Sequence, residues 1–569
     1  MRRTLVLALT ALALLGVVTP DVYAQMPAAA PGAPAPTFKI TGFIDEVMTY
    51  SRNVSVVDAD LHRIDTMWYG RTRGRFDIIG EYGKAKAVLG LELDFVYGQT
   101  GSGNSNISTV QGGAVTAPTG GVFANFGTDG SLSLNTDVRG IIEIKWLYTE
   151  FEVPLIPVPT VARLGAQPFG SAANYKLATY ANGDFAGVNL VSTITPNVKS
   201  VASFVSVEEN LVGKQCGFAT STCFGVPRFQ LRGDDWAVIL APEITPVKGL
   251  DIKPMYSYFT ASGTTSGNAR QGRGGISATT WFQNSAGLPA PNDDGSWRKG
   301  INEDRHTVGI DARYRMGPFS LDPTVLYQFG NVSLVAPTLG SGNFPVQFLN
   351  AGVVPGRKYT PSIDAWLADV RAGYQLGPLL LEAMGMYSTG QSARNTTLGK
   401  IHYFQPLDTD TSYLADWGGQ LTALGVDYLN ALIESGGPIA YPGTAIGWDK
   451  YGRYQFGARA TYALTPAFSL YGGVNYHRTD KAIQKNAIPG ANGLIPVFIG
   501  SQASKDTSTY LGTELFGGIT WRFAPGIAWD NAGGYMFMGS AMDALTNPAT
   551  GPRDAKDSYI VTSRIRFSF

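Results

Sequence analysis

The sequence predicts an all-β protein, a transmembrane antiparallel β-barrel of about 18 strands with short turns at one end and long loops at the other. Three observations predict this fold. The chain begins with an export signal, continues in amphipathic segments of strand periodicity, and ends on an aromatic residue in the last such segment. Independent features that agree on one structure are a strong indication of it.

Residues 1–24 have the pattern of a secretory signal peptide. They combine a basic start, an apolar run over 5–18 and a small-residue ending at Ala24. A retained membrane anchor is the alternative, but it needs about 20 apolar residues. Because the apolar run stops before Pro20, we expect cleavage after Ala24.

Residues 25–36 (QMPAAAPGAPAP) are rich in proline and alanine, which is typical of an extended periplasmic leader. We find no later linker, so the sequence predicts one barrel domain over 37–569. Charged residues make up only 15% of the chain, against about 25% in soluble proteins. After the signal peptide, no apolar stretch is long enough for a membrane-spanning helix.

The charge balance gives no indication of a nucleic-acid partner. Cleavage of the signal peptide removes two arginines and one aspartate, which leaves 42 basic and 43 acidic residues. Such a balance lacks the excess of one sign that points to nucleic acid or an acidic polymer.

Period-two alternation is clearest in two neighbouring segments. Residues 67–79 (MWYGRTRGRFDII) place apolar and small residues on one face and three arginines with an aspartate on the other. Residues 85–97 (AKAVLGLELDFVY) place seven apolar residues opposite Lys86, Glu92 and Asp94. Alternation over a full membrane thickness is typical of a barrel strand with one face in lipid and one in water.

Tight turns and long loops alternate along the chain. Turns are expected near Tyr82 and Pro157, and at six repeats of an apolar residue, a small residue and proline: 194–196, 244–246, 316–318, 376–378, 464–466 and 523–525. Nine longer polar segments separate the hairpins: 51–66, 98–136, 170–183, 209–232, 261–304, 331–361, 391–450, 479–506 and 539–556. Seventeen connections imply about 18 strands, to within about two, with both termini periplasmic.

Two prolines fall inside expected strands. Pro254 and Pro323 would each remove a ladder hydrogen bond. We expect either bulges at these positions or strand boundaries that differ from ours.

The C-terminal segment 557–569 (DSYIVTSRIRFSF) alternates apolar residues with Thr562, Arg564, Arg566 and Ser568. An amphipathic last strand that stops on Phe569 looks like the assembly signal of outer-membrane proteins that the barrel-assembly machinery reads. We expect this strand to pair with 37–50 and to point Phe569 at lipid.

The best candidates for function are charged residues that the alternation places on the inner wall. A tight turn near Tyr82 brings the row Arg71, Arg73 and Arg75 opposite 85–97 and places Arg71 or Arg73 next to Glu92. Such charges either set up a transverse field that selects solutes or form a salt-bridged wall that keeps the lumen wet. The pore-lining candidates are Arg71, Arg73, Arg75, Lys86, Glu92, Asp94, Asp311, Arg313, Arg315, Asp369, Arg371, Arg459, Glu514, Arg522, Arg564 and Arg566.

Aromatic residues near strand ends predict interfacial girdles on the outer face. A role in stacking on sugars is the alternative. The alternation places these aromatic side chains on the outer face, which disfavours that role. The girdle residues include Trp68, Tyr97, Trp146, Tyr148, Trp366 and Trp521.

Cys216 and Cys223 are the only cysteines and lie in one loop of an exported chain, which favours a local disulfide. The four histidines are scattered singly, so no metal site is expected. We find no nucleophile elbow, Walker loop or HExxH motif. The sequence therefore predicts no catalytic residues, no enzyme and no cofactor.

Three stretches resemble the homotrimeric porins of Gram-negative bacteria: 71–95 (RTRGRFDIIGEYGKAKAVLGLELDF), 142–169 (IEIKWLYTEFEVPLIPVPTVARLGAQPF) and 184–192 (DFAGVNLVS). The likeness implies a trimer of barrels in outer-membrane lipid and lipopolysaccharide, each passing small hydrophilic solutes by passive diffusion. It also implies a third loop that narrows the pore. The segment 170–183 (GSAANYKLATYANG) departs from this pattern, because it is short and has Lys176 but no acidic residue. A longer loop is then the alternative source of the constriction.

Two other functions stay open at this stage. One is a substrate-selective channel of about 18 strands, or an exporter, for sugars, oligosaccharides or organic anions. The other is a surface protein whose long loops, above all 391–450, bind partners while the barrel serves as an anchor.

Overall fold

The computed structural model of the chain describes residues 35–53, 66–97, 130–132, 141–168, 180–182, 184–208, 235–263, 301–335, 354, 357–391, 399–409, 451–484, 487–489, 496–498, 507–545 and 554–569. The predicted signal peptide and all but the last two residues of the predicted leader lie outside these ranges.

Within these ranges, eighteen barrel strands form one closed antiparallel sheet, as predicted. In chain order they are β1 (Thr37–Arg52), β2 (Thr66–Tyr82), β3 (Ala85–Tyr97), β5 (Ile141–Glu152), β6 (Thr160–Pro168), β8 (Asp184–Thr195), β9 (Val198–Glu208), an interrupted strand made of β10 (Asp235–Leu240) and β11 (Glu243–Val247), β12 (Leu250–Gly263), β13 (Ile301–Met316), β14 (Phe319–Val335), β16 (Ser362–Leu376), β17 (Leu379–Ser388), β20 (Arg453–Thr465), β21 (Phe468–Gln484), β24 (Thr507–Ala524), β25 (Ile527–Met538) and β26 (Ser558–Ser568).

Short elements lie in the connections at one end of the barrel. They are β4 (Gly130–Leu132), β7 (Ala181–Asn182), β15 (Lys358–Tyr359), β18 (Lys400–Ile401), β19 (Asp408–Thr409), β22 (Ala487–Pro489), β23 (Pro496–Phe498) and the 3₁₀ helix η4 (Ser540–Leu545). In the part of the chain that the structure describes, no helix is long and apolar enough to cross a membrane.

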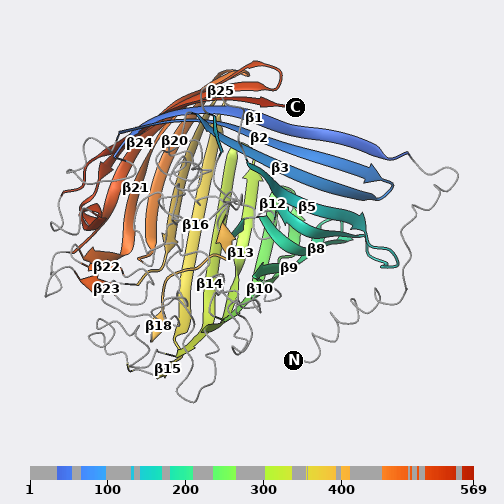
Figure 1. Ribbon diagram of the computed structural model, residues 1–569, viewed down its shortest axis with the longest axis horizontal. Coiled ribbons are helices and arrows are strands. Elements are labelled where there is room, and N and C mark those ends of the chain that lie inside the picture. Colours follow the sequence, from blue (N-terminus) through green and yellow to red (C-terminus); the bar gives the residue numbers. More distant parts are fainter. Residues whose placement is uncertain are drawn as a thin grey trace, which may run out of the picture.

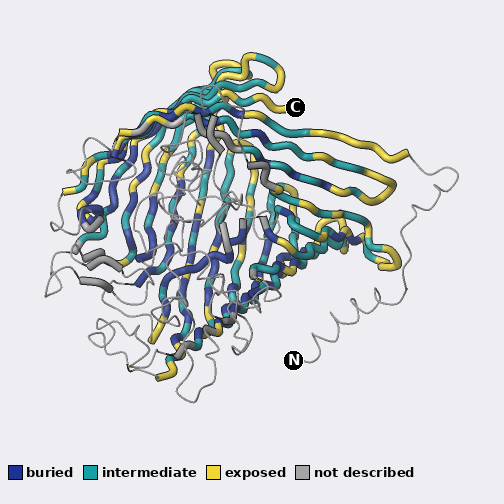
Figure 2. Tube along the Cα trace, viewed as in Figure 1, coloured by how far each residue is buried: buried dark blue, intermediate teal, exposed yellow. Residues whose placement is uncertain are grey.

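Each barrel strand forms because its side chains alternate between two environments. β2 and β3 pair without a register shift over twelve residues, from Arg71 opposite Val96 to Tyr82 opposite Ala85. Figure 1 shows the strands side by side as one curved sheet, and Figure 2 shows buried residues along the strands and exposed ones gathered at the tight turns. The alternation follows from the pleat, which sends successive side chains to opposite faces.

The sheet closes where β26 meets β1. The two strands pair from Phe43 opposite Ser568 to Arg52 opposite Tyr559, and Gly42 and Phe569 exchange two backbone hydrogen bonds of 3.0 Å. The predicted pairing of the last strand with the first is therefore confirmed. β1, together with β2 and β3, continues past the C-terminus (Figure 1).

Eight tight turns define one end of the barrel, which we call the turn rim; the opposite end is the loop rim. Gly317, Gly377 and Gly526 have positive φ in three of these turns, a conformation that glycine adopts without strain. The expected turn at 244–246 is wrong by a few residues. These residues belong to β11, and the chain reverses between Val247 and Leu250.

The two prolines inside strands sit where a ladder is already interrupted. Pro254 lies in β12 opposite Ile310, and on its other side the neighbouring strand is broken between β10 and β11. Pro323 lies in β14, where the pairing with β13 skips from Thr324 to Leu321. Each proline therefore lies where the hydrogen-bond ladder is already interrupted, so its missing N–H breaks no continuous ladder.

We predict that cysteines at Thr49 and Thr562 form a disulfide across the closing seam. These residues are directly opposed, their hydroxyl oxygens lie 2.9 Å apart, and opposed Cα atoms in such a pair lie about 4.5–5.5 Å apart. In a Cys216→Ser, Cys223→Ser background, the T49C/T562C variant should cross-link on mild oxidation, read by intact mass. The control Y50C/T562C, with side chains on opposite faces, should not; equal cross-linking of both would contradict the register.

Candidate functional site

The strands divide the barrel wall into two faces. Because directly paired residues share a face, the pairing of Asp45 with both Arg73 and Arg566 places these three side chains together. An exposed apolar exterior on a closed barrel suits a hydrocarbon environment, so the charged face is the inner wall. The exposed apolar side chains of the outer face include Ile44, Met48, Leu147, Trp366, Val370, Phe456, Leu515, Val561, Ile565 and Phe567.

Glu92 of β3 is the centre of the predicted charge cluster on the inner wall. Arg75 lies directly opposite and forms an ion pair with it. Arg73 reaches Glu92 through a contact of 3.5 Å between Nη2 and Oε1, and Nζ of Lys145 on β5 lies 3.8 Å from Oε2. The expected neighbour Arg73 is confirmed, and the direct partner is the next arginine in the row.

Arg71 is the member of the row that does not reach Glu92. The register places it opposite Val96 on one side and Val47 on the other, so of the two arginines expected next to Glu92, only Arg73 lies there. Its side chain is buried. Asp94 faces Arg73 in the register, but its side chain lies outside the described residues.

Lys86 takes part in a second cluster nearer the turn rim. Its Nζ lies 2.7 Å from Oε1 of Glu150 on β5, and Nη2 of Arg163 on β6 lies 2.7 Å from Oε2 of the same carboxylate. Sequence reasoning had not selected Glu150 or Arg163. Both residues lie in the stretch 142–169 that resembles porins, but this stretch has no regular alternation that would have placed them on the inner face.

Both arginines of the C-terminal strand are inner-wall residues, as predicted. Arg566 donates to Asp45 at 2.6 Å across the closing seam, and its guanidinium lies 4.1 Å from the ring centroid of Phe43. Arg564 donates to Asp530 of β25 at 2.8 Å. One ion pair thus crosses the seam on its lumen side, and a second joins β25 to β26 beside it.

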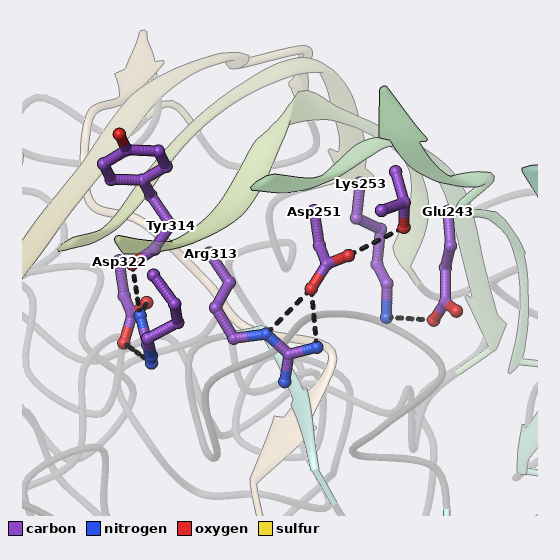
Figure 3. Close-up of polar contacts among 8 residues, drawn as sticks. Glu243, Asp251, Lys253, Arg313, Tyr314 and Asp322 are labelled. Carbon is purple, nitrogen blue, oxygen red and sulfur yellow. Dashed lines mark hydrogen bonds and ion pairs between the residues drawn. The ribbon is translucent and has the colours of Figure 1, made fainter. Parts of the chain in front are cut away.

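A third group of ion pairs lines β11 to β14 at the turn rim (Figure 3). Arg313 donates to Asp251 at 2.8 Å, and Nζ of Lys253 lies 2.8 Å from Glu243. Figure 3 shows these four side chains on the same side of the sheet and Tyr314 on the other. The predicted inward position of Arg313 is confirmed.

The other predicted residues on this side of the barrel also have partners on the inner wall. Asp311 accepts a hydrogen bond of 2.5 Å from Thr324, and Arg315 forms an ion pair with Asp322. Further pairs are Arg371 with Asp369 at 3.8 Å, Arg459 with Glu382 at 2.7 Å, and Glu514 with Asn475 at 3.5 Å. The predicted residues are thus spread around the wall in local pairs rather than gathered at one point.

Two segments from the loop rim fold into the lumen. One lies in the third loop, which the resemblance implied would narrow the pore, and the other lies in a longer loop, which was the alternative. They are 180–182, between β6 and β8, and 399–409, between β17 and β20. Gln405 binds the inner wall at three points: its N–H donates to Oε1 of Gln328 at 2.8 Å, its carbonyl accepts from Nε2 of Gln328 at 2.6 Å, and its Oε1 accepts from Arg305 at 2.8 Å. We call these three residues the clamp.

The two inward segments also contact each other. The N–H of Leu407 donates to the carbonyl of Tyr180 at 2.8 Å, and β7 pairs with β19 in parallel. The hydroxyl of Tyr180 donates to Ser257 of β12 at 2.8 Å. Both the short third loop and the longest loop therefore supply residues that narrow the lumen.

An apolar cluster fills the space between these segments and the wall from β8 to β17. Tyr180, Phe404 and Leu407 come from the inward segments and are fully buried. Inward side chains of the strands complete the cluster, among them Val201, Val205, Ala237, Ile239, Met255, Phe259, Leu326, Leu367, Met384 and Met386. The loop half of this wall is thus covered, whereas the wall from β25 through β1 to β6 carries the paired charges.

The aromatic girdle is confirmed in part. Trp68, Trp366 and Trp521 are exposed on the outer face, and the side chain of Tyr97 lies outside the described residues. Trp146 and Tyr148 are on the inner wall, so their predicted outward position is wrong. Trp146 donates to Asp77 at 2.8 Å, and the guanidinium of Arg163 lies 4.7 Å from the ring of Tyr148.

The cause is a β-bulge in β5. The pairing with β3 shifts between Gly90, which faces Trp146, and Leu91, which faces Ile144. Lys145 is the extra residue, and it reverses the alternation expected from the residues before it. A bulge of this kind leaves no sequence pattern that period-two reasoning detects.

The predicted disulfide between Cys216 and Cys223 lies outside the described residues. Among the residues that are described, no group of three or more His, Cys, Asp or Glu side chains could hold a metal ion.

Comparisons with known proteins give structural neighbours only. No protein-family model matches the chain, and no curated protein matches it significantly. OccK8 (OprE) of Pseudomonas aeruginosa has 10% identity and a TM-score of 0.41, covering 94% of this chain and 98% of its own. OpdK of the same species, solved with vanillate, has 8% identity and a TM-score of 0.42 over 93% and 98% of the two chains. OccAB3 of Acinetobacter baumannii has 8% identity and a TM-score of 0.41, covering 93% of this chain and 100% of its own. At these values the fold assignment rests on the strand pairings of this chain alone.

We predict that Gln328→Ala releases the segment 399–409 from the wall. The change removes two hydrogen bonds to Gln405, each worth about 1 kcal/mol, so amides of this segment should exchange hydrogen roughly thirtyfold faster. Mass-spectrometric hydrogen exchange measures the rate. Gln455→Ala, whose amide contacts Met384 instead, is the matched control; unchanged exchange in Gln328→Ala would contradict the clamp.

Proposed function

We propose that the chain forms a water-filled channel in an outer membrane and passes small hydrophilic solutes and ions by passive diffusion. One observation carries this proposal: a closed barrel has an apolar exterior and an inner wall lined with ion pairs such as Arg566 with Asp45. Charged side chains on the inner face favour a hydrated lumen, since isolated charges in a dry interior are costly.

A substrate-selective channel is the second candidate, and the inward segments favour it. The clamp residues Arg305, Gln328 and Gln405 hold 399–409 against one wall. The opposite wall keeps its charges in pairs of both signs, including Arg75 with Glu92. A lumen narrowed on one side and charged on the other brings solutes close to specific groups.

We also propose that three copies assemble through the outer face of β1 and β2. Glu46 interrupts the apolar exterior there and accepts a hydrogen bond of 2.5 Å from Thr72. Gly70 and Gly74, on the same face, have no side chains beside it. A carboxylate facing lipid is costly, and a subunit contact would shield it. The remaining exterior would contact lipid and lipopolysaccharide. Phe569, exposed beside Phe76 and Phe567, would be read by the barrel-assembly machinery.

Single-channel recording in planar bilayers tests the channel directly. A large current that no solute saturates supports a general diffusion channel, and a current that one solute class blocks supports the selective channel. Absence of current from folded protein would contradict both and favour a barrel that only anchors surface loops.

We predict that the double substitution Arg73→Gln, Arg75→Gln shifts ion selectivity toward cations. It removes two positive charges beside Glu92, so the potassium-to-chloride permeability ratio should rise roughly two- to threefold. Reversal potentials in a KCl gradient measure the ratio. Arg478→Gln, whose guanidinium lies over the outer-face ring of Tyr454, is the control. A reversal potential that stays constant would show that the two arginines are only structural.

We predict that the detergent-solubilised protein has the mass of three chains by light scattering. Glu46→Arg should dissociate it into single barrels, because arginine is longer than glutamate and cannot accept the hydrogen bond from Thr72, so it would not fit the contact that shields the carboxylate. Glu81→Arg, exposed at the turn rim, is the control. A single-chain mass for the unmodified protein would contradict the trimer and leave the channel proposal intact.

A further inference from the structure

The β-bulge in β5 aims one large aromatic side chain into the lumen. Ile144 and Leu147 remain on the outer face, with 63% and 55% of their surface exposed, while Lys145 and Trp146 between them both turn inward. Bulges of this kind are common next to functional sites, where they redirect a side chain. The bulge therefore directs the indole of Trp146 to the inner wall.

The indole of Trp146 lies flat against the wall. A Cβ built on Gly90 would be 2.1 Å from Nε1, 2.3 Å from Cδ1 and 2.5 Å from Cε2 of the indole. Nearly equal distances to three adjacent ring atoms mean that this position points at the face of the ring and not at its edge. β3 thus covers one face of the indole, and Trp146 is still partly exposed, which we attribute to the face on the lumen side.

The orientation of the ring is fixed. Its Nε1–H donates to Oδ1 of Asp77 at 2.8 Å, and only glycine at position 90 leaves room for the ring. A planar side chain held in one orientation loses little further freedom when a ligand stacks on it.

Charges of both signs border the indole. Toward the loop rim is the carboxylate of Glu92 with Arg75 and Lys145. Toward the turn rim is the carboxylate of Glu150 with Lys86 and Arg163. The platform is therefore flanked by hydrogen-bond acceptors and donors on two sides, all on the inner wall.

We propose that Trp146 is a stacking platform for the ring of a neutral saccharide in the lumen. A pyranose has an apolar face of C–H groups, which packs on an aromatic face, and a rim of hydroxyls, which donate to carboxylates and accept from guanidinium and ammonium groups. An aromatic carboxylate also stacks on indole, but the cations beside the platform are already paired with the carboxylates of Glu92 and Glu150. A neutral ring with hydroxyls can hydrogen-bond to both signs of such pairs without breaking them, whereas an anion would have to compete with the two carboxylates. This inference rests on the proposed channel and names a solute class for it.

The test is block of single-channel potassium current by maltotriose, with benzoate as the comparison solute. The unmodified channel should show a saturable block by maltotriose and none by benzoate at equal concentration. Trp146→Ala should raise the half-blocking concentration roughly three- to tenfold, the loss expected for one aromatic stack. Trp146→Phe, a smaller change to the fold, should raise it by less. Trp68→Ala, on the outer face with 77% of its surface exposed, is the matched control and should leave the block unchanged.

The outcomes separate the two proposals. Absence of current in the unmodified protein would overturn the channel and this inference together. Current without saturable block by maltotriose would overturn the saccharide site and leave the channel standing. Block that is equal in the unmodified, Trp146→Ala and Trp146→Phe channels would overturn the role of Trp146, and block by benzoate in place of maltotriose would overturn the solute class.

Discussion

The hydrogen bonds between β1 and β26 are the constraint on which the rest of the structure depends. In an apolar medium an unpaired backbone N–H or C=O costs roughly several kcal/mol, so a membrane sheet can have no open edge. The seam runs from Arg52 opposite Tyr559 to the reciprocal bonds of Gly42 with Phe569. On its lumen side Arg566 pairs with Asp45 and Thr49 pairs with Thr562, so the closing residues are also inner-wall residues.

Closure creates an inner wall whose two sides differ. From β25 through β1 to β6 the inward side chains pair charge with charge, as in Arg564 with Asp530 and Lys86 with Glu150. From β8 to β17 an apolar cluster lines the inner wall nearer the loop rim, and the segments 180–182 and 399–409 pack against it and against polar residues such as Arg305 and Gln328. In the proposed channel, solutes would therefore meet the charged side, on which Trp146 lies.

The strands and most of the inward positions could be predicted from the sequence, because both follow from a hydrophobic period of two residues. Arg313, Arg459 and Arg566 are where the alternation placed them. The arginine row was placed on the correct face but two residues out of register with Glu92, because a turn near Tyr82 fixes the pairing only to within a residue or two.

Two features could not be predicted from the sequence. The bulge at Lys145 reverses the alternation without any proline or glycine in β5 to mark it, and the space for Trp146 comes from Gly90 on another strand. The inward course of 399–409 depends on Arg305 and Gln328, which lie 100 and 77 residues before Gln405 in the chain. At such separations only the folded barrel brings the three residues together. Contacts between distant strands and loops have no local pattern.

The measurement that tests the central claim most directly is the reactivity of single cysteines with a membrane-impermeant cationic methanethiosulfonate. The central claim is that the inner wall faces water and the outer wall faces lipid. In a Cys216→Ser, Cys223→Ser background reconstituted in liposomes, Arg75→Cys should react readily, because Arg75 lies on the inner wall beside Glu92. Phe76→Cys, one residue on and beside Phe569 on the outer face, should stay unmodified. Equal reactivity of the two positions, or reaction at Phe76→Cys alone, would contradict the claim.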